Sequence, residues 1–314
     1  MEATLYNAAM RGNIGDGNFL FADHFKRNEE NGYQVTPKGN TVLHVTSLYG
    51  NSHFVENVLK ITPALLCYQN KKNETTLHIA ANEGHTEVVH VLLARIEHHN
   101  TKEKLTRMTG TSGDTALHKV VRSQHLDVVK ILVKEDPEFK FPPNNVQETP
   151  LYVAAESSFH DALINILESC KKPIYAAGPS NRTPLHAAVI QEHKIALDHY
   201  GVGISLYARN LTYGTTAIHI AASEGDVNMI NKLLNHCPDS WDMLNSNHQN
   251  DLHVVVLNNQ DKVVHFLLDS DKCDSLVDEP DSDGNTPLHL VVVSGNHVLE
   301  LIKHSRAKPM SFIK

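Results

Sequence analysis

The chain has 314 residues, a net charge of −8 at neutral pH and four cysteines. The acidic balance argues against a nucleic-acid partner, which favours a basic surface, and the widely spaced cysteines indicate reduced thiols rather than a disulfide framework. The longest apolar runs, such as 254–257, fall far short of the ~20 residues that a membrane span needs, so we expect no direct membrane insertion by this chain.

Residues 1–36 predict a degenerate N-terminal capping repeat. No apolar signal sequence opens the chain, so the chain as written is expected to be cytoplasmic. Residues 5–9, followed by Gly12, form a weak copy of a phrase that returns further on. The spacing Gly12, Gly15 and Gly17 does not predict a phosphate-binding loop, because no strand precedes it and no Lys-Ser or Lys-Thr pair follows. We interpret these glycines as a flexible connection.

The phrase Thr-x-Leu-His, with minor variation, returns eight times after residue 36. The copies begin at steps of 34, 40, 34, 34, 33, 34 and 36 residues, at Thr41, Thr75, Thr115, Thr149, Thr183, Thr216, Asn250 and Thr286. A period near ~33 residues with a Thr-Pro-Leu-His core is typical of ankyrin repeats. The sequence therefore predicts an all-α solenoid of stacked helix pairs joined by hairpin turns. We expect a single array through residues 1–314, because stacked repeats form one continuous core.

The second copy shows the physical logic of one repeat. Thr75 supplies a hydroxyl that can cap free N–H groups at a helix start. Leu77 and the alanines 80–81 then face the core, and Gly84 ends the first helix in a left-handed conformation. Residues 88, 89, 92 and 93 are apolar at the spacing of a second helix. The pair is too short to bury its apolar face alone, so it must stack on its neighbours.

Two turn positions of each repeat favour residues that tolerate a positive φ. In the hairpin two residues before the threonine, Gln147 and His248 replace glycine or asparagine, which predicts strained or differently shaped turns there. At the end of the first helix the glycine is replaced in four copies, which should be looser: Gln124, Ser158, Glu192 and Asn259.

Three segments depart from the regular period. The step of 40 places about six extra polar residues around 97–108, which predicts a longer second helix or a projecting loop. In the fifth copy Gly201 and Gly203 interrupt the second apolar stripe, so that helix should be short and the array should open first between 192 and 212. Residues 305–314 form a polar tail.

The runs 37–44, 132–139, 148–156, 182–190, 217–225 and 283–290 together resemble plant ankyrin proteins of the accelerated-cell-death type. The resemblance covers nearly the whole chain. It implies a C-terminal Pro-Gly-Gly domain with membrane helices, the cytosolic face of the plasma membrane, and a role in defence, cell death or salt stress. This chain departs from the pattern twice, since it holds no such membrane domain and its fifth and sixth copies look like two neighbours fused after loss of about one repeat.

The many histidines are expected to be structural. Seven of the 22 fill the repeat slot, where an imidazole can bond backbone groups between repeats, whereas a zinc site needs three or four converging ligands. We therefore predict no metal site, no cofactor and no catalytic residue, because no motif with a known mechanism is present. The repeat signature that we assign to the scaffold is Thr41, His44, Thr75, His78, Thr115, His118, Thr149, Thr183, His186, Thr216, His219, His253, Thr286 and His289.

The pattern favours a non-enzymatic protein-interaction scaffold, with a partner of unknown identity. The alternative is the cytosolic part of a membrane-anchored regulator, and an enzyme or metal-binding protein comes a distant third. Stacked repeats present a concave face made of turn tips and first helices, on which tyrosine and arginine are frequent anchors. The candidate partner-binding residues on that face are Tyr49, Lys71, Lys72, Glu74, Asn82, Glu83, Arg122, Arg182, Tyr213 and Glu224.

Overall fold

The computed structural model describes residues 1–16, 19–20, 33–97, 102–170, 178–192, 214–270, 273–294 and 301. The chain divides into two compact units, Met1–Ile174 and Tyr175–Lys314. The regular elements of both units are helices, apart from two strands of two residues each near the N-terminus. The predicted all-α fold of paired helices is thus confirmed, and a single array through 1–314 stays a prediction.

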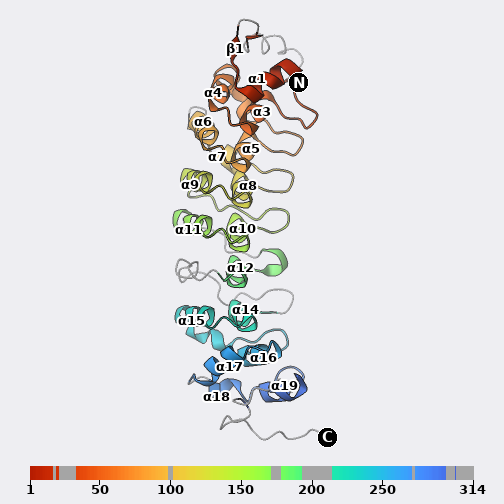
Figure 1. Ribbon diagram of the computed structural model, residues 1–314, viewed down its shortest axis with the longest axis vertical. Helices are drawn as coiled ribbons and strands as arrows, with labels where there is room; N and C mark the ends of the chain where they lie inside the picture. The colour runs from red at the N-terminus through yellow and green to blue at the C-terminus, as the bar shows by residue number, and fades with distance from the viewer. Residues whose placement is uncertain are drawn as a thin grey trace. The chain divides into compact units, whose positions relative to one another are not determined.

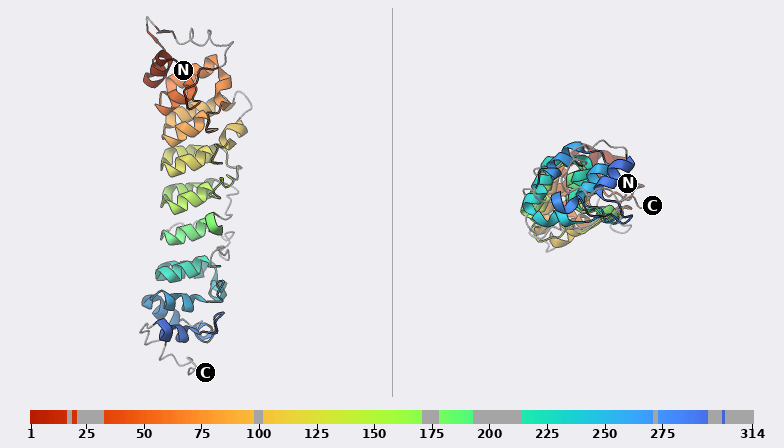
Figure 2. Two further views of the ribbon diagram at one scale, coloured as in Figure 1. Left: turned by 90° about the vertical axis from the view of Figure 1, so that its right-hand side faces the viewer. Right: turned by 90° about the horizontal axis from the view of Figure 1, so that it is seen from below.

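Unit 1 consists of helix pairs that stack in layers. The first helices of the pairs form one column, in which α3 contacts α5, α5 contacts α8 and α8 contacts α10. The second helices form another column, in which α4, α6, α9 and α11 each contact the next. Figure 1 shows the hairpins of this unit projecting beyond the first column of helices, away from the second, and Figure 2 shows the layers from the side. The helices are α1 (Ala3–Arg11), α3 (Val42–Leu48), α4 (Ser52–Ile61), α5 (Thr76–Asn82), α6 (Thr86–Glu97), α7 (Lys102–Arg107), α8 (Ala116–Arg122), α9 (Leu126–Glu135), α10 (Pro150–Glu156) and α11 (His160–Ser169), with a 3-10 turn η1 (Pro63–Cys67).

Unit 2 repeats the same pairing. Helix α14 packs on α12, α15 and α16, and α16 packs on α17 and α19. The helices are α12 (Pro184–Ile190), α14 (Ala217–Glu224), α15 (Val227–His236), α16 (Asp251–Leu257), α17 (Asp261–Leu268), α18 (Cys273–Leu276) and α19 (Pro287–Ser294), with 3-10 turns η2 (Pro179–Asn181) and η3 (Pro238–Asp242).

The core of each layer comes from the apolar positions of the repeat. In the second copy Leu77, Ala80 and Ala81 of α5 have no exposed surface, and neither do Val88 and Leu92 of α6. The alanines bring the paired helices close together, and the leucine fills the space between neighbouring layers. Burying a leucine side chain stabilises the fold by roughly 1.5–3 kcal/mol. The apolar positions of each repeat therefore contribute a large part of the free energy that holds the layers together.

The two turn positions of every described copy adopt the left-handed backbone, whatever residue occupies them. In the hairpins Gln147 (φ 67°) and His248 (φ 57°) take the same conformation as glycine in other copies. The turns are therefore not differently shaped; they have the common shape at the conformational cost of about 1–2 kcal/mol for a residue with a Cβ. The same holds after the first helices for Gln124, Ser158, Glu192 and Asn259.

The structure corrects two local predictions. α6 has 12 residues, two more than α4 or α9, as the longer-helix alternative predicted, but residues 102–107 form a separate helix, α7, whose Leu105 is fully buried, and not a projecting loop. Arg107 anchors it with two hydrogen bonds to Asp136, of 2.9 and 3.0 Å. Near the N-terminus Gly12 caps α1 with a φ of 69°, and β1 (Gly15–Asp16) pairs antiparallel with β2 (Phe19–Leu20), with Gly15 opposite Leu20, so this part is ordered secondary structure rather than a flexible connection. Gly17, Gly201, Gly203, most of 192–212 and the tail 305–314 lie outside the described residues.

Candidate binding surfaces

In six of the described copies a buried histidine links one repeat to the next. In the second copy the backbone N–H and the hydroxyl of Thr75 both lie near Nδ1 of His78, at 3.1 and 2.8 Å. On the other side of the ring Nε2 lies 3.1 Å from the carbonyl oxygen of Asp114, in the hairpin of the third copy. Equivalent bonds of 3.0–3.1 Å run from His44, His118, His186, His219 and His253.

These contacts fix the form of the imidazole. A carbonyl oxygen can only accept and a backbone N–H can only donate, so Nε2 must carry the hydrogen and Nδ1 must be the acceptor. The ring is therefore neutral in the folded chain. Burial accordingly lowers the pKa of His78 and of His118 to about 4, and lowers the pKa of His44 and His253 as well. These histidines hold adjacent repeats together and are unavailable to a metal ion.

The fourth copy and the last copy differ from this arrangement. Tyr152 replaces histidine, and its backbone N–H donates to the hydroxyl of Thr149 at 3.1 Å. Its side chain is 2% exposed, and its hydroxyl lies 3.4 Å from a carboxylate oxygen of Glu156. In the last copy Nδ1 of His289 accepts from the N–H of Thr286 at 3.2 Å. The last copy thus keeps the bond from the threonine N–H to the histidine ring, whereas the fourth copy keeps only the threonine hydroxyl cap.

Four of the described hairpins are closed by an asparagine or aspartate side chain five residues before the helix start, a position that the sequence interpretation did not single out. Oδ1 of Asn70 accepts from the N–H groups of Lys72 and Glu74 at 2.8 and 3.0 Å. Asn144, Asn245 and Asp281 make the same pair of bonds in their copies. Asparagine and aspartate favour such turns. Their recurrence at a fixed offset from the threonine was the signal that could have revealed them.

Backbone hydrogen bonds tie neighbouring hairpins into a ladder. In unit 1 the N–H of Lys71 donates to the carbonyl of Lys38 at 3.1 Å, and the N–H of Thr111 donates to the carbonyl of Lys72 at 2.8 Å. In unit 2 the N–H of Ser282 donates to the carbonyl of Asn247 at 2.9 Å. The hairpin tips therefore form a connected surface within each unit, and their side chains are held at regular intervals.

On unit 1 this surface carries a network of charges. Lys119 pairs with Glu74 at 3.0 Å, and Arg122 bridges Asp114 and Glu148 at 2.7 and 2.5 Å. Burial alone would raise the pKa of Asp114, but hydrogen bonds from Arg122 and Asn144 outweigh it and hold that pKa below its usual value. Two of the predicted partner-binding residues, Glu74 and Arg122, thus lie in ion pairs that join adjacent repeats.

The other predicted residues of unit 1 lie at the edges of that network. Lys71 and Lys72 are exposed on a hairpin tip. Tyr49 is 42% exposed, and its hydroxyl lies 3.2 Å from that of Tyr6. Asn82 donates to the carboxylate of Glu83 at 2.9 Å and accepts from the hydroxyl of Ser123 at 3.0 Å.

On unit 2 the corresponding surface is hollow and largely uncharged. A pocket of about 460 Å³ has apolar walls from Ile190, Ile220 and Leu257, with amide side chains between them. Leu257 is 44% exposed. The structure brings two predicted residues, Arg182 and Glu224, to this pocket, whereas Tyr213 lies outside the described residues. Sequence reasoning missed Leu257, although an apolar residue seven positions after the helix start faces the same surface as Arg122.

The described part of the chain gives little support for metal binding, a membrane span or a reactive cysteine. No group of three or more His, Cys, Asp or Glu side chains there could hold a metal ion. Within the same residues, every helix is too short or too polar to cross a bilayer. Among the described residues Cys67, Cys170 and Cys237 are thiols outside any disulfide, and burial raises the pKa of Cys170 to about 12, which disfavours its reactive thiolate.

Comparison with curated proteins finds relatives that are similar over part of the chain. Protein ACCELERATED CELL DEATH 6 from Arabidopsis thaliana is 28% identical over 141 residues, which cover 42% of this chain and 21% of that protein. A transient receptor potential cation channel subfamily A member 1 homolog from Caenorhabditis elegans is 26% identical, over 64% of this chain and 16% of the channel. The nuclear factor NF-kappa-B p105 subunit from Gallus gallus is 28% identical, over 61% and 17%. The chain thus spans about a fifth or less of each of them.

Comparison with solved structures and with family patterns identifies the repeats. The ankyrin repeat domain of Bcl-3 superposes with a TM-score of 0.62 at 17% identity, over 74% of this chain and 98% of that domain. At that identity the likeness shows the fold alone. The family pattern described as "Ankyrin repeats (3 copies)" matches residues 5–104, 98–174, 194–278 and 218–312. The chain belongs to the ankyrin-repeat family.

Proposed function

We infer that the chain is a non-enzymatic protein-binding module whose partner lies along the hairpin tips and first helices. One observation carries this proposal. The buried bonds from histidine to the carbonyl of the next hairpin recur in six copies with nearly constant geometry, whereas the side chains displayed on the surface change in charge and size. A uniform scaffold with a varied surface suits recognition of another protein, because the scaffold sets the spacing and the displayed residues set the specificity.

The class of partner follows from the two surfaces. On unit 1, Lys71 and Lys72 stand beside a charge network that is already neutralised by internal ion pairs. On unit 2, the hollow beneath Leu257 offers apolar walls and amide groups. A partner with an acidic contact for the first surface and a large apolar side chain for the second would suit both. Such a partner buries apolar area at the hollow and gains specificity from the lysines.

The finer proposal places this binding in plant defence, cell-death or stress signalling. It is supported by the likeness to Protein ACCELERATED CELL DEATH 6 from Arabidopsis and by the runs of sequence that resemble proteins of that type. The alternative is that the chain is the cytosolic domain of a membrane-anchored regulator at the plasma membrane. Sequencing the full transcript in its source separates the two, because the alternative requires an encoded run of ~20 apolar residues outside the present chain.

Peptide selection followed by surface variants tests the binding proposal. A random peptide library is selected on the wild-type chain, and the binders are measured against K71E/K72E and against L257E. We expect each change to weaken the binders that touch its surface, by about tenfold or more for a contact worth 1.4 kcal/mol. K140E/K262E is the matched control, since both lysines are exposed and lie away from the hairpin tips and the hollow. Binders that are unaffected by both K71E/K72E and L257E would place the binding surface elsewhere.

A further inference from the structure

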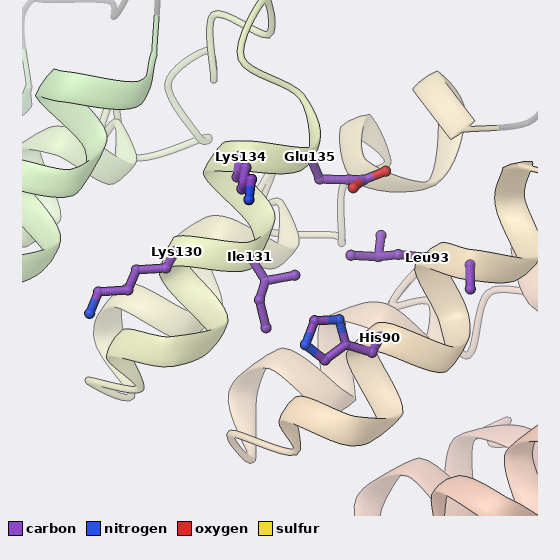
Figure 3. Close-up of a pocket in the computed structure, with 7 residues that line it drawn as sticks. His90, Leu93, Lys130, Ile131, Lys134 and Glu135 are labelled. Atoms are coloured by element: carbon purple, nitrogen blue, oxygen red, sulfur yellow. The ribbon is translucent and has the colours of Figure 1, made fainter.

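A second groove lies on the opposite side of unit 1, between the second helices α6 and α9. Its volume is about 480 Å³, within the range of ligand pockets. Leu93 and Ala94 of α6 and Ile131 of α9 line its apolar part. Figure 3 shows Ile131 and His90 pointing toward each other from the two helices. The hairpins and first helices that carry the proposed function contribute no residue to it.

The groove has a basic rim. Lys130 and Lys134 stand one helical turn apart on α9, so their Cβ atoms lie about 5–6 Å apart on one face. Both are exposed, and neither takes part in an ion pair among the described residues. Glu135 is half-buried at one end and is the one carboxylate in the lining. The chain as a whole has a net negative charge, so the charge of this rim is opposite to that of the chain.

The interface between α4 and α6 shows how the equivalent surface of the preceding repeats differs in charge. Glu56 of α4, His90 of α6 and Lys130 of α9 each lie fifteen residues after the helix-start threonine of their copy. Between α4 and α6, Glu56 binds Lys60 at 2.9 Å and lies 3.5 Å from Arg95, so in that interface a carboxylate of the chain itself faces the two cations. Between α6 and α9, His90 occupies the position of Glu56, and the carboxylate of the lining is Glu135 on α9. In addition, α6 has the small Ala94 at the position that Lys60 and Lys134 hold in α4 and α9.

We propose that the α6–α9 groove docks an acidic amphipathic segment of a protein partner. A large apolar side chain of that segment occupies the space above Ala94, in contact with Leu93 and Ile131. Carboxylates on either side of it bind Lys130 and Lys134, and so supply the acidic groups that Glu56 provides in the preceding interface. The apolar contact supplies most of the affinity, and the charges select the sequence and orient it.

The test is a random peptide library selected on the wild-type chain and depleted on K130E/K134E. The remaining peptides should carry a leucine, phenylalanine or similar residue between Asp or Glu residues. Their affinity should fall by about tenfold in K130E/K134E, the loss expected for about 1.4 kcal/mol, and should fall with added salt. A94L fills the groove without altering charge, and it should weaken the same peptides while leaving the fold intact, since Ala94 is exposed on the helix surface.

Two comparisons keep this proposal separate from the proposed function. K71E/K72E alters the hairpin surface and should leave these peptides unaffected, whichever way the hairpin proposal turns out. An empty pool after depletion, a pool without acidic residues, or peptides indifferent to A94L would overturn the proposal. So would binding of phosphatidylserine vesicles that depends on Lys130 and Lys134 in the absence of any selected peptide, because the basic rim would then serve a lipid surface.

Discussion

Nε2 of His219 lies 4.0 Å from Oδ1 of Asp251 and makes its hydrogen bond of 3.1 Å to the carbonyl of Gln249. Asp251 is 1% exposed, and neither of its carboxylate oxygens has a hydrogen-bond partner among the described residues. Burial therefore raises its pKa well above the usual value for aspartate. The residue occupies the first position of α16, where α8 and α14 have Ala116 and Ala217.

Replacement of Asp251 by alanine should stabilise unit 2. A buried polar group without a partner costs roughly 1–3 kcal/mol, and alanine is the residue at this position in two other copies. The pKa of Asp251 is higher in the folded chain than in the unfolded chain, where it is 3.8. The free energy of unfolding is therefore highest below pH 3.8 and decreases as the pH rises toward the pKa of the folded chain. We expect D251A to be more stable than wild type at pH 7 and to show a smaller advantage near pH 4, in urea denaturation at both values. An equal gain at both pH values would contradict this account of the carboxyl.

The bridging histidines should make unit 1 sensitive to acid. His118 has an ordinary pKa of 6.5 when unfolded and about 4 in the folded chain. The unfolded state binds the proton first, so stability falls as the pH drops from 6.5 toward 4, by about 1.4 kcal/mol per pH unit for each such histidine. The stability advantage of wild type over H118Q should therefore shrink by about 2 kcal/mol between pH 7 and pH 5. Parallel stability curves for the two proteins would show that His118 titrates normally in the folded chain.

A comparison of two hairpin glycines can distinguish the cost of backbone strain from the cost of a steric clash. Gly39 and Gly284 occupy the same turn position at φ of 79° and 83°. A Cβ on Gly39 would lie 2.8 Å from the backbone nitrogen of Lys71, whereas a Cβ on Gly284 would meet no described atom within 4 Å. G284A should cost about 1–2 kcal/mol, the strain alone. G39A should cost more, because it also displaces the hydrogen bond from Lys71 to Lys38. Equal thermal shifts for the two variants would mean that the hairpin ladder adapts freely.

Truncation of a core leucine should have a local effect. Leu77 and Leu185 have no exposed surface, and L77A or L185A should cost about 2–5 kcal/mol. Repeats interact with their nearest neighbours, so hydrogen exchange should accelerate in the altered repeat and in the adjacent ones. Uniform loss of protection in all eight copies, after either change, would contradict nearest-neighbour coupling.

The periodic features could be predicted from sequence, and the exceptions could not. The spacing of Thr75 and Leu77 relative to other copies indicated a capped helix with a buried leucine, because one pattern recurred often enough to identify its role. The same reasoning did not anticipate α7, although Leu105 lies as far before Thr115 as the buried Leu65 lies before Thr75. Nor could it show that Glu74 and Arg122 meet charges from adjacent repeats, because the partners of a surface charge depend on how the layers stack. The unpaired carboxyl of Asp251 was hidden for the same reason.

The hydrogen bond from His78 to Asp114 spans 36 residues, and the one from His118 to Glu148 spans 30. Nevertheless the two bonds measure 3.1 and 3.0 Å. The distance between hairpins is therefore set by the imidazole and not by the length of chain between them. Additional sequence can enter between α6 and α7 without changing the register of the displayed face. An added peptide or a labelled loop could therefore be inserted at that junction of unit 1 without changing the spacing of the hairpins.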